Sequence, residues 1–431
     1  MIDGYNEFLA SKAVRVPMMG VCEVPELAAH LFPFQAACVA HNLRAGRAGL
    51  FLDTGLGKTE CQLEWCRHAM DATNGRGLIL TPLAVAQQTK RRAERWGYEA
   101  RVIRDQSEAG DGINICNYDR LDRLDTAFYG AVSLDEGSIL KSFNGKTRAA
   151  LTSAFGNTPF RLVATATPAP NDHMELGQYA DYLGIMASNE MLSRWFINDT
   201  STASQEWRLK NHAVNDFWDW MASWARMAER PSDLGDDATD AQFVLPPYFL
   251  TNHKSSNVEI MNLTDGLFAN TIMSATTMHD VKRQTSRARA ETAAEIVASE
   301  PNEPHILWCD TDYEADALKD ACKTAHEIRG SMSIELKEEL IEGFATGAIK
   351  HLIGKPSMLG FGLDWSHCAR MTFVGRSFSY EKFYQALRRC WRFGQKRELQ
   401  VNIIVAEGED TVARAIARKA DGHTSMKSAM R

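Results

Sequence analysis

Short apolar runs, each followed by a proline or an acid within two residues, recur along the first half of the chain. The segments between them carry apolar residues at helical spacing, as in the stretch from 83 to 96. Because strands buried on both faces of a parallel sheet are almost continuously apolar, this alternation predicts a doubly wound α/β lobe. The predicted strands cover residues 48–52, 77–82, 113–118, 131–136 and 160–166.

A second alternation of the same kind begins near residue 282. Its predicted strands cover residues 305–309, 327–329, 351–354 and 371–374, and its predicted helices cover 282–299, 313–322 and 334–344. We therefore expect an α/β protein of two lobes, each a parallel sheet flanked by helices. Residues 1–265 would form the first lobe and residues 266–431 the second.

The stretch from about 172 to 243 interrupts this rhythm and predicts a helical insertion in the first lobe. Its aromatic residues either stack on nucleic-acid bases or form the buried stripe of a helix, and their spacing favours the stripe. These residues are Phe217, Trp218, Trp220 and Trp224. The acidic segment 231–240 predicts an exposed turn, and the apolar segment 248–251 predicts a strand that completes the first lobe.

Composition and charge narrow the class of protein. The chain has 431 residues, nine scattered cysteines without a C-x-x-C pair, and no apolar run near the ~20 residues that a membrane span needs. Residues 1–11 lack a basic and apolar leader, so we expect a cytoplasmic protein with reduced thiols. The net charge is −7, yet the segment from Arg370 to Arg431 holds 13 basic and 6 acidic residues, which permits a basic face.

The segment from Asp53 to Thr59 reads Asp-Thr-Gly-Leu-Gly-Lys-Thr and lies between a predicted strand and a predicted helix. Its glycines let backbone N–H groups turn around a phosphate, Lys58 can reach the β- and γ-phosphates, and the Thr59 hydroxyl can ligate Mg²⁺. A strict P-loop has glycine where this chain has Leu52, so a chance glycine loop is the alternative. The expected nucleotide contacts are Thr54, Gly55, Leu56, Gly57, Lys58 and Thr59.

Two further features fit a nucleotide site. Asp135 and Glu136 end a predicted strand, where one acid would hold Mg²⁺ and the other would orient the attacking water. Phe34 and Gln35 precede the glycine loop by about twenty residues; the amide suits the N6/N7 edge of adenine and the ring can cover the base. The alternatives are acids that merely end a strand and a phenylalanine that merely packs.

A basic helix is predicted near the end of the second lobe. Arg389 and Arg392 are three residues apart, so they would project from adjacent turns in similar directions. A pair of guanidinium groups can bind a γ-phosphate and stabilise charge in the transition state. A solvated basic helix is the alternative for either arginine alone.

Together these motifs resemble those of superfamily 2 helicases, with the Swi2/Snf2-like branch closest. The matching segments are Leu-Phe-Pro-Phe-Gln at 31–35, the glycine loop, Asp135-Glu136, Thr-Ala-Thr-Pro at 165–168, Gly-Phe-Gly-Leu-Asp at 360–364 and Gln385 to Gln395. One departure is Gly137-Ser138, where that branch has Ala-His. The catalytic acids are retained, but the usual route that couples hydrolysis to the third motif is missing its histidine.

The resemblance implies two RecA-like lobes, one ATP with Mg²⁺, and Arg389 and Arg392 supplied by the second lobe. It adds Gly362, Asp364 and Gln385 to the nucleotide contacts. It places nucleic acid near Thr81, Pro82, Lys141, Gly360 and Phe361, with little sequence preference.

The form of the last motif, Arg392-Phe393-Gly394-Gln395, favours duplex or branched DNA as the track, and so an ATP-dependent DNA helicase or translocase acting as a monomer. An RNA helicase and a nucleotide-gated binding module with little turnover remain alternatives. The compact size resembles helicases encoded by bacteriophages, which would act in the host cytoplasm.

Overall fold

The computed structural model divides the chain into two compact units, one reaching Phe243 and the other beginning at Val244. The structure describes residues 16–82, 85–141, 145–169, 173–199, 206–255, 275–359, 363–375 and 380–405. The predicted contacts Gly360, Phe361 and Gly362 lie outside the described residues.

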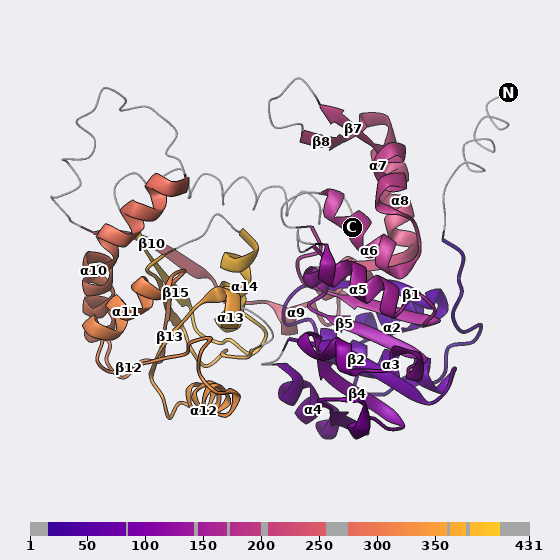
Figure 1. Ribbon diagram of the computed structural model, residues 1–431, viewed down its shortest axis with the longest axis horizontal. Coiled ribbons are helices and arrows are strands. Elements are labelled where there is room, and N and C mark those ends of the chain that lie inside the picture. Colours follow the sequence, from indigo (N-terminus) through magenta and orange to yellow (C-terminus); the bar gives the residue numbers. More distant parts are fainter. Residues whose placement is uncertain are drawn as a thin grey trace. The chain divides into compact units, whose positions relative to one another are not determined.

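The first unit is built on a seven-stranded parallel sheet in the order β3-β4-β2-β5-β6-β1-β9 (Figure 1). The strands are β1 (Arg47–Leu52), β2 (Arg76–Thr81), β3 (Ala100–Val102), β4 (Gly112–Asn117), β5 (Ala131–Asp135), β6 (Phe160–Ala164) and β9 (Ala225–Ala228). All five strands predicted from the apolar runs are present. The order places β6 between β1 and β5, so the carboxyl ends of these three strands meet at one edge.

Helices cover both faces of this sheet because alternate strand residues point to opposite sides. Ile79 packs with one group of helices and Leu78 and Leu80 with the other. The first group is α2 (Pro33–Ala45), α3 (Lys58–Asp71) and α4 (Ala86–Arg95). The second group includes α5 (Lys146–Ala154), α6 (Leu176–Leu183), α7 (Ser188–Trp195) and α8 (Val214–Trp224).

The predicted insertion is helical in α6, α7, α8 and the short α9 (Asp240–Phe243), and it also contributes strands. Strand β9 pairs with β1 in the main sheet, and β7 (Phe196–Asp199) with β8 (Glu206–Leu209) forms an antiparallel hairpin beyond the ends of α7 and α8 (Figure 1). The aromatic residues of α8 are all buried, which confirms the core interpretation: Phe217, Trp218, Trp220 and Trp224.

The second unit contains a six-stranded parallel sheet in the order β10-β15-β14-β11-β13-β12. Its strands are β10 (Tyr248–Lys254), β11 (His305–Trp308), β12 (Ala325–Glu327), β13 (His351–Gly354), β14 (Arg370–Phe373) and β15 (Leu399–Val405). Its helices are α10 (Ala275–Ser299), α11 (Asp312–Ala321), α12 (Ile334–Ala345), α13 (Pro356–Leu359) and α14 (Tyr380–Cys390). The two-lobed α/β fold predicted from the sequence is confirmed.

Strand β10 belongs to the second unit, although the sequence predicted it in the first lobe. We expected the segment at 248–251 to complete the first lobe, but β10 pairs in parallel with β15 of the second sheet, from Tyr248 opposite Leu399 to Lys254 opposite Val405. The division between the units accordingly falls at Phe243 and Val244 rather than after residue 265. The sequence shows that the segment is a strand, whereas its partner depends on contacts about 150 residues away.

Candidate active site

The glycine loop follows β1 and ends where α3 begins at Lys58. Gly55 and Gly57 have φ angles of 96° and 79°, in the region that favours glycine, so the loop turns as the sequence predicts. The Lys58 ammonium lies inside the loop, where Nζ donates to the carbonyl oxygens of Leu52 at 2.9 Å and Asp53 at 3.3 Å. A phosphate bound by this loop would meet that ammonium and the amino end of α3.

Gln35 of α2 contacts the loop directly. Its Nε2 donates to the Leu56 carbonyl at 2.9 Å, and its Oε1 accepts from the Phe32 amide at 3.0 Å. A Cβ on Gly57 would come within 2.1 Å of the Gln35 Nε2, so glycine is required there for the close approach as well as for its φ. The amide thus supports the loop backbone, and its contact with adenine stays a prediction.

Phe34 lies in the core with 1% of its surface exposed and packs edge-on against Phe243. This position favours packing over the predicted cover of a base. Its backbone amide donates to Asp236 Oδ2 at 3.2 Å. Asp236 is buried, although the acidic segment around it was predicted to be an exposed turn, because this carboxylate accepts an N–H at the start of α2.

Asp135 is the last residue of β5 and is 6% exposed. Its Oδ1 accepts a hydrogen bond from Gln62 Nε2 of α3 at 2.9 Å, and the Gln62 Oε1 accepts from the Ser133 hydroxyl at 2.7 Å. The Tyr118 hydroxyl donates to the Asp135 backbone carbonyl at 2.6 Å. Burial, followed by the charge of Asp135, raises the pKa of the Tyr118 phenol, so this donor keeps its proton.

Gln62 is a site residue that was not predicted from the sequence. It follows Thr59 by three residues and Lys58 by four, which puts all three on one face of α3. That helical spacing was the available signal.

Glu136 has a φ of 53°, the only positive value among the described residues other than glycine, and is 8% exposed. The following Gly137 packs so tightly that a Cβ there would lie 2.3 Å from Val163 Cγ1. This contact gives a physical reason for glycine at position 137, because the alanine usual there would collide with Val163 of β6.

The third motif follows β6. Thr165 and Thr167 are fully buried, and the Thr167 amide donates to the Thr165 hydroxyl at 3.2 Å. Lys141 Nζ donates to the Thr167 carbonyl at 2.5 Å and lies 3.4 Å from Glu175 Oε2. Its side chain is 7% exposed, so its position favours an internal link over the predicted phosphate contact.

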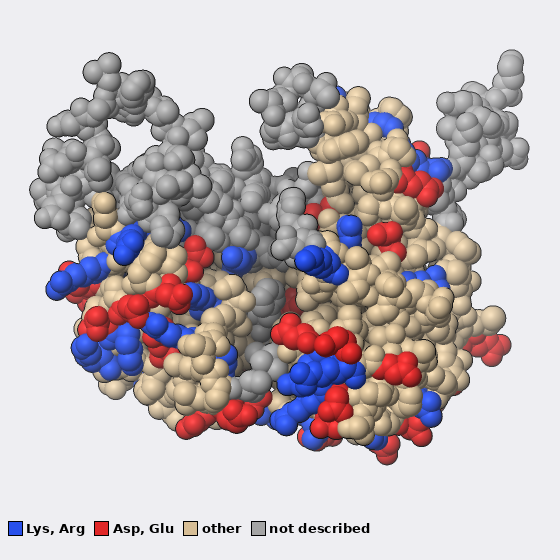
Figure 2. All heavy atoms as spheres, in the orientation of Figure 1, with Lys and Arg blue, Asp and Glu red and all other residues tan. Residues whose placement is uncertain are grey.

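The other predicted nucleic-acid contacts in the first unit, Thr81 and Pro82, end β2. Thr81 is fully buried and its hydroxyl donates to the Pro82 carbonyl at 2.9 Å, whereas Pro82 is half-buried. The nearby α4 is basic, but two of its charges have acidic partners: Arg92 pairs with Glu60 and Lys90 lies 3.5 Å from Glu94. Figure 2 shows red and blue side chains interleaved over this part of the unit.

In the second unit the two predicted arginines converge on one carbonyl. Arg389 Nη1 and Arg392 Nη1 donate to the Leu363 oxygen at 3.2 Å and 2.7 Å, and Arg392 Nε lies 3.5 Å from Asp364 Oδ2. Arg389 is 1% exposed and Arg392 9%. Both arginines were predicted on one helix, but α14 ends at Cys390 and Arg392 lies just beyond it. The two guanidinium groups are nevertheless adjacent, because both donate to the Leu363 carbonyl.

Gln385 is buried in the same helix, and its backbone carbonyl accepts from Arg389 Nε at 2.9 Å. A fully buried ion pair at 3.0 Å joins Arg289 of α10 to Glu314 of α11, and Arg289 also donates to the backbone carbonyl of Val374 after β14. Glu314 also accepts from the backbone amides of Asp310 and Thr311. These contacts link α10, α11 and the segments that follow β11 and β14 at the carboxyl edge of the second sheet.

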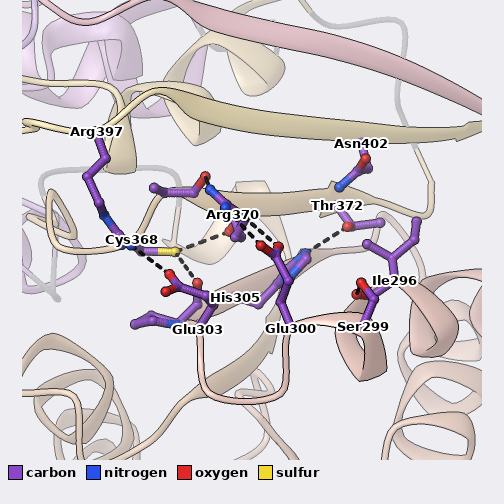
Figure 3. Close-up of polar contacts among 12 residues, drawn as sticks. Ile296, Ser299, Glu300, Glu303, His305, Cys368, Arg370, Thr372, Arg397 and Asn402 are labelled. Carbon is purple, nitrogen blue, oxygen red and sulfur yellow. Dashed lines mark hydrogen bonds and ion pairs between the residues drawn. The ribbon is translucent and has the colours of Figure 1, made fainter.

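The opposite, amino edge of this sheet carries a separate polar cluster (Figure 3). Arg370 forms two hydrogen bonds with Glu300, at 2.6 Å and 2.9 Å, and His305 Nε2 lies 2.8 Å from the Thr372 hydroxyl. Arg397 reaches Glu303 at 2.6 Å. These contacts tie the end of α10 and the chain before β15 to the sheet, which is a structural role.

Magnesium fits the donor set of the first unit. The Thr59 hydroxyl and the Asp135 carboxylate are hard oxygen ligands, and a Mg²⁺ site needs only one or two protein groups beside phosphate and water. Among the residues that the structure describes, no group of three or more His, Cys, Asp or Glu side chains is arranged to hold a metal. When bound, the ion would neutralise phosphate charge.

In the described part of the chain no helix is long and apolar enough to cross a membrane.

The first unit has a parallel sheet with a glycine loop after β1 and an acid at the end of β5, and the second unit has a parallel sheet of its own, which is consistent with two RecA-like lobes. Residues 288–394 match the family model of the helicase conserved C-terminal domain, which confirms the predicted resemblance to helicases. The structure of the Sulfolobus solfataricus SWI2/SNF2 ATPase core in complex with dsDNA is similar at 17% identity and a TM-score of 0.43, over 95% of each chain. No curated protein sequence matches the chain significantly.

Proposed function

We propose that this chain hydrolyses ATP and couples hydrolysis to movement along DNA, as a superfamily 2 helicase or double-stranded DNA translocase of the Swi2/Snf2-like branch. The observation that carries the proposal is the link between α3 and β5. Helix α3 begins with Lys58 and Thr59 and contacts Asp135 through Gln62 at 2.9 Å. The groups needed for phosphate and for Mg²⁺ thus belong to one packed assembly.

In this proposal Lys58 and the loop amides hold the phosphates, while Thr59 and Asp135 hold the metal ion. Glu136 orients the attacking water. Arg389 and Arg392 of the second unit add positive charge that stabilises the transition state. Their hydrogen bonds to the Leu363 carbonyl hold the two guanidinium groups side by side.

Duplex or branched DNA is the proposed track, because the Arg-x-Gly-Gln form of the last motif resembles the DNA-directed branch. An RNA helicase is the nearest alternative. The binding module with little turnover has one observation in its favour, the missing histidine after Asp135 and Glu136. The contact between Lys141 and Thr167 weakens that alternative, since it offers another link to the third motif.

The nine free cysteines agree with a cytoplasmic location.

Steady-state ATP hydrolysis by the full chain tests the proposal, with no polymer, duplex DNA, single-stranded DNA, forked DNA and RNA at matched salt. We expect strong stimulation by one DNA form, which weakens as salt rises because phosphate contacts release counterions. Stimulation by RNA alone would overturn the choice of track. A flat and near-zero rate with every polymer would favour the binding module.

A further inference from the structure

We infer that Gln62 is a positioning residue for the metal site, which holds the Asp135 carboxylate in the orientation that receives Mg²⁺. The inference rests on the proposed function and deepens it. The resemblance to helicases assigns this residue no role, and it lies outside the glycine loop.

Helix α3 places Gln62 beside Asp135. Gln62 projects from the same helix face as Lys58 and Thr59, one turn further on, and is 1% exposed. This face packs on the side of β5 that carries Ser133 and Asp135, two residues apart and therefore on one side of the strand. The helix that carries the proposed ligand Thr59 thus contacts the proposed ligand Asp135 of β5 through the Gln62 side chain.

The two hydrogen bonds of the Gln62 amide have defined directions. A serine hydroxyl can donate to the Gln62 Oε1, at 2.7 Å, and a carboxylate can only accept from its Nε2, at 2.9 Å. Ser133 therefore fixes which end of the amide faces Asp135. The amide N–H in turn fixes the orientation of the Asp135 carboxylate.

Removing a side chain that hydrogen-bonds a metal ligand usually weakens metal binding by about 10-fold to 100-fold. A Gln62→Met variant keeps the length of the side chain but loses the donor. A Ser133→Ala variant keeps Gln62 and removes only the hydroxyl that orients it. Asn114→Ala is a matched control, because Asn114, on β4, is another buried amide side chain of the first unit and donates to the Gly77, Gly110 and Gly112 carbonyls.

Calorimetric titration of the full chain with ADP, in excess Mg²⁺ and in EDTA, separates metal binding from nucleotide binding. We expect Mg²⁺ to tighten ADP binding by the wild type, and Gln62→Met to lose that gain by about 10-fold while its affinity in EDTA stays within about twofold. Ser133→Ala should lose part of the gain, and Asn114→Ala none.

If Mg²⁺ tightens ADP binding as much in both the Gln62 and Ser133 variants as in the wild type, the role of Gln62 is ruled out. The proposed function would be unaffected by that result. An equal loss of affinity in Mg²⁺ and in EDTA would also overturn the inference, since that pattern indicates a structural role. If the wild type binds no nucleotide in either buffer, the proposed function itself fails. Should Gln62→Met not fold, Ser133→Ala, which loses a single oxygen atom, still decides between these outcomes.

Discussion

Lys141 donates from Nζ to the backbone carbonyl of Thr167 over 2.5 Å, which joins the segment after Asp135 and Glu136 to the third motif. The ammonium also lies 3.4 Å from Glu175 and 5.8 Å from the centre of the Tyr179 ring. The sequence lacks the histidine that resembling proteins carry at position 138. A different side chain therefore connects the same two motifs here.

Replacing Lys141 with methionine should uncouple the two motifs, because the apolar side chain fills the space but cannot donate. We expect ATP hydrolysis without polymer to stay within about twofold of wild type, and the stimulation by DNA to fall about 10-fold. Lys146→Met is the control, as Lys146 is an exposed lysine five residues away. Equal stimulation in both variants would show that the contact only supports the fold.

Replacing Lys58 with alanine should remove most ATP turnover, by about 100-fold or more, because the loop then lacks its charge opposite the phosphates. The measurement is steady-state hydrolysis at saturating ATP and DNA. Lys90→Ala on α4 is the control, since that side chain is partly exposed and lies beside Glu94. Near-normal turnover in Lys58→Ala would rule out the phosphate-binding role of the loop.

Replacing Arg392 with alanine should cut turnover by about 100-fold and leave ATP binding within about threefold, because its charge is needed most in the transition state. Arg389→Ala should reduce turnover similarly and also lower the melting temperature, since Arg389 is 1% exposed and loses two internal hydrogen bonds. Single-turnover hydrolysis and equilibrium ATP binding separate the effects. Weakened binding with unchanged turnover would argue against this role.

Gly137→Ala should lower the free energy of unfolding by about 1–3 kcal/mol, because its Cβ would lie 2.3 Å from Val163 Cγ1 in a closely packed sheet. Adding Val163→Ala makes room for the new methyl group, so the double variant should be less destabilised than the two single effects added together. Gly330→Ala is the control, as a Cβ there meets no atom within 4 Å. Urea unfolding measures each effect, and strict additivity would contradict the collision.

The stability of the first unit should fall in acid through Glu64, whose side chain is fully buried. Burial raises the pKa of this carboxyl, but hydrogen bonds from His68, Tyr98 and the Ala28 amide, with the charge of Arg67, outweigh it and lower the pKa to about 2. A carboxyl with a depressed pKa stabilises the fold above its unfolded pKa of about 4.5. That contribution is lost as pH falls from about 4.5 to about 2.

A Glu64→Gln variant measures this contribution, because the amide does not titrate. Urea unfolding between pH 6 and pH 3 should give a steeper loss of stability in the wild type than in the variant, by about 1–2 kcal/mol. Other acidic residues titrate in both proteins and cancel in the difference. Parallel curves would mean that the Glu64 carboxyl is not held in its charged form.

Much of the fold followed from local pattern. The apolar runs fixed the five strands of the first unit around the candidate site, and the glycines of the loop fixed its turn through their freedom at positive φ. The aromatic stripe of α8 was correctly assigned to the core. The short strands β3 and β9 were missed, since runs of three or four residues carry little periodicity.

The burial of polar side chains was much harder to predict. Thr81 and Lys141 were expected to face nucleic acid, and both are enclosed by the first unit. Asp236 was expected in an exposed turn and instead accepts from the amide of Phe34. A polar residue is buried when a partner satisfies it, and that partner is usually distant in the sequence.

The sequence by itself determined the glycine loop, the acids at the end of β5 and the spacing of the two arginines, because each depends on neighbours within one turn or one strand. Only the tertiary structure decided that Gln62 bridges α3 to Asp135, that Lys141 reaches Thr167, and that β10 joins the second sheet. Those pairs are 73, 26 and about 150 residues apart. Local backbone preference acts over a few residues, whereas pairing over these separations is selected by the packing of the whole unit.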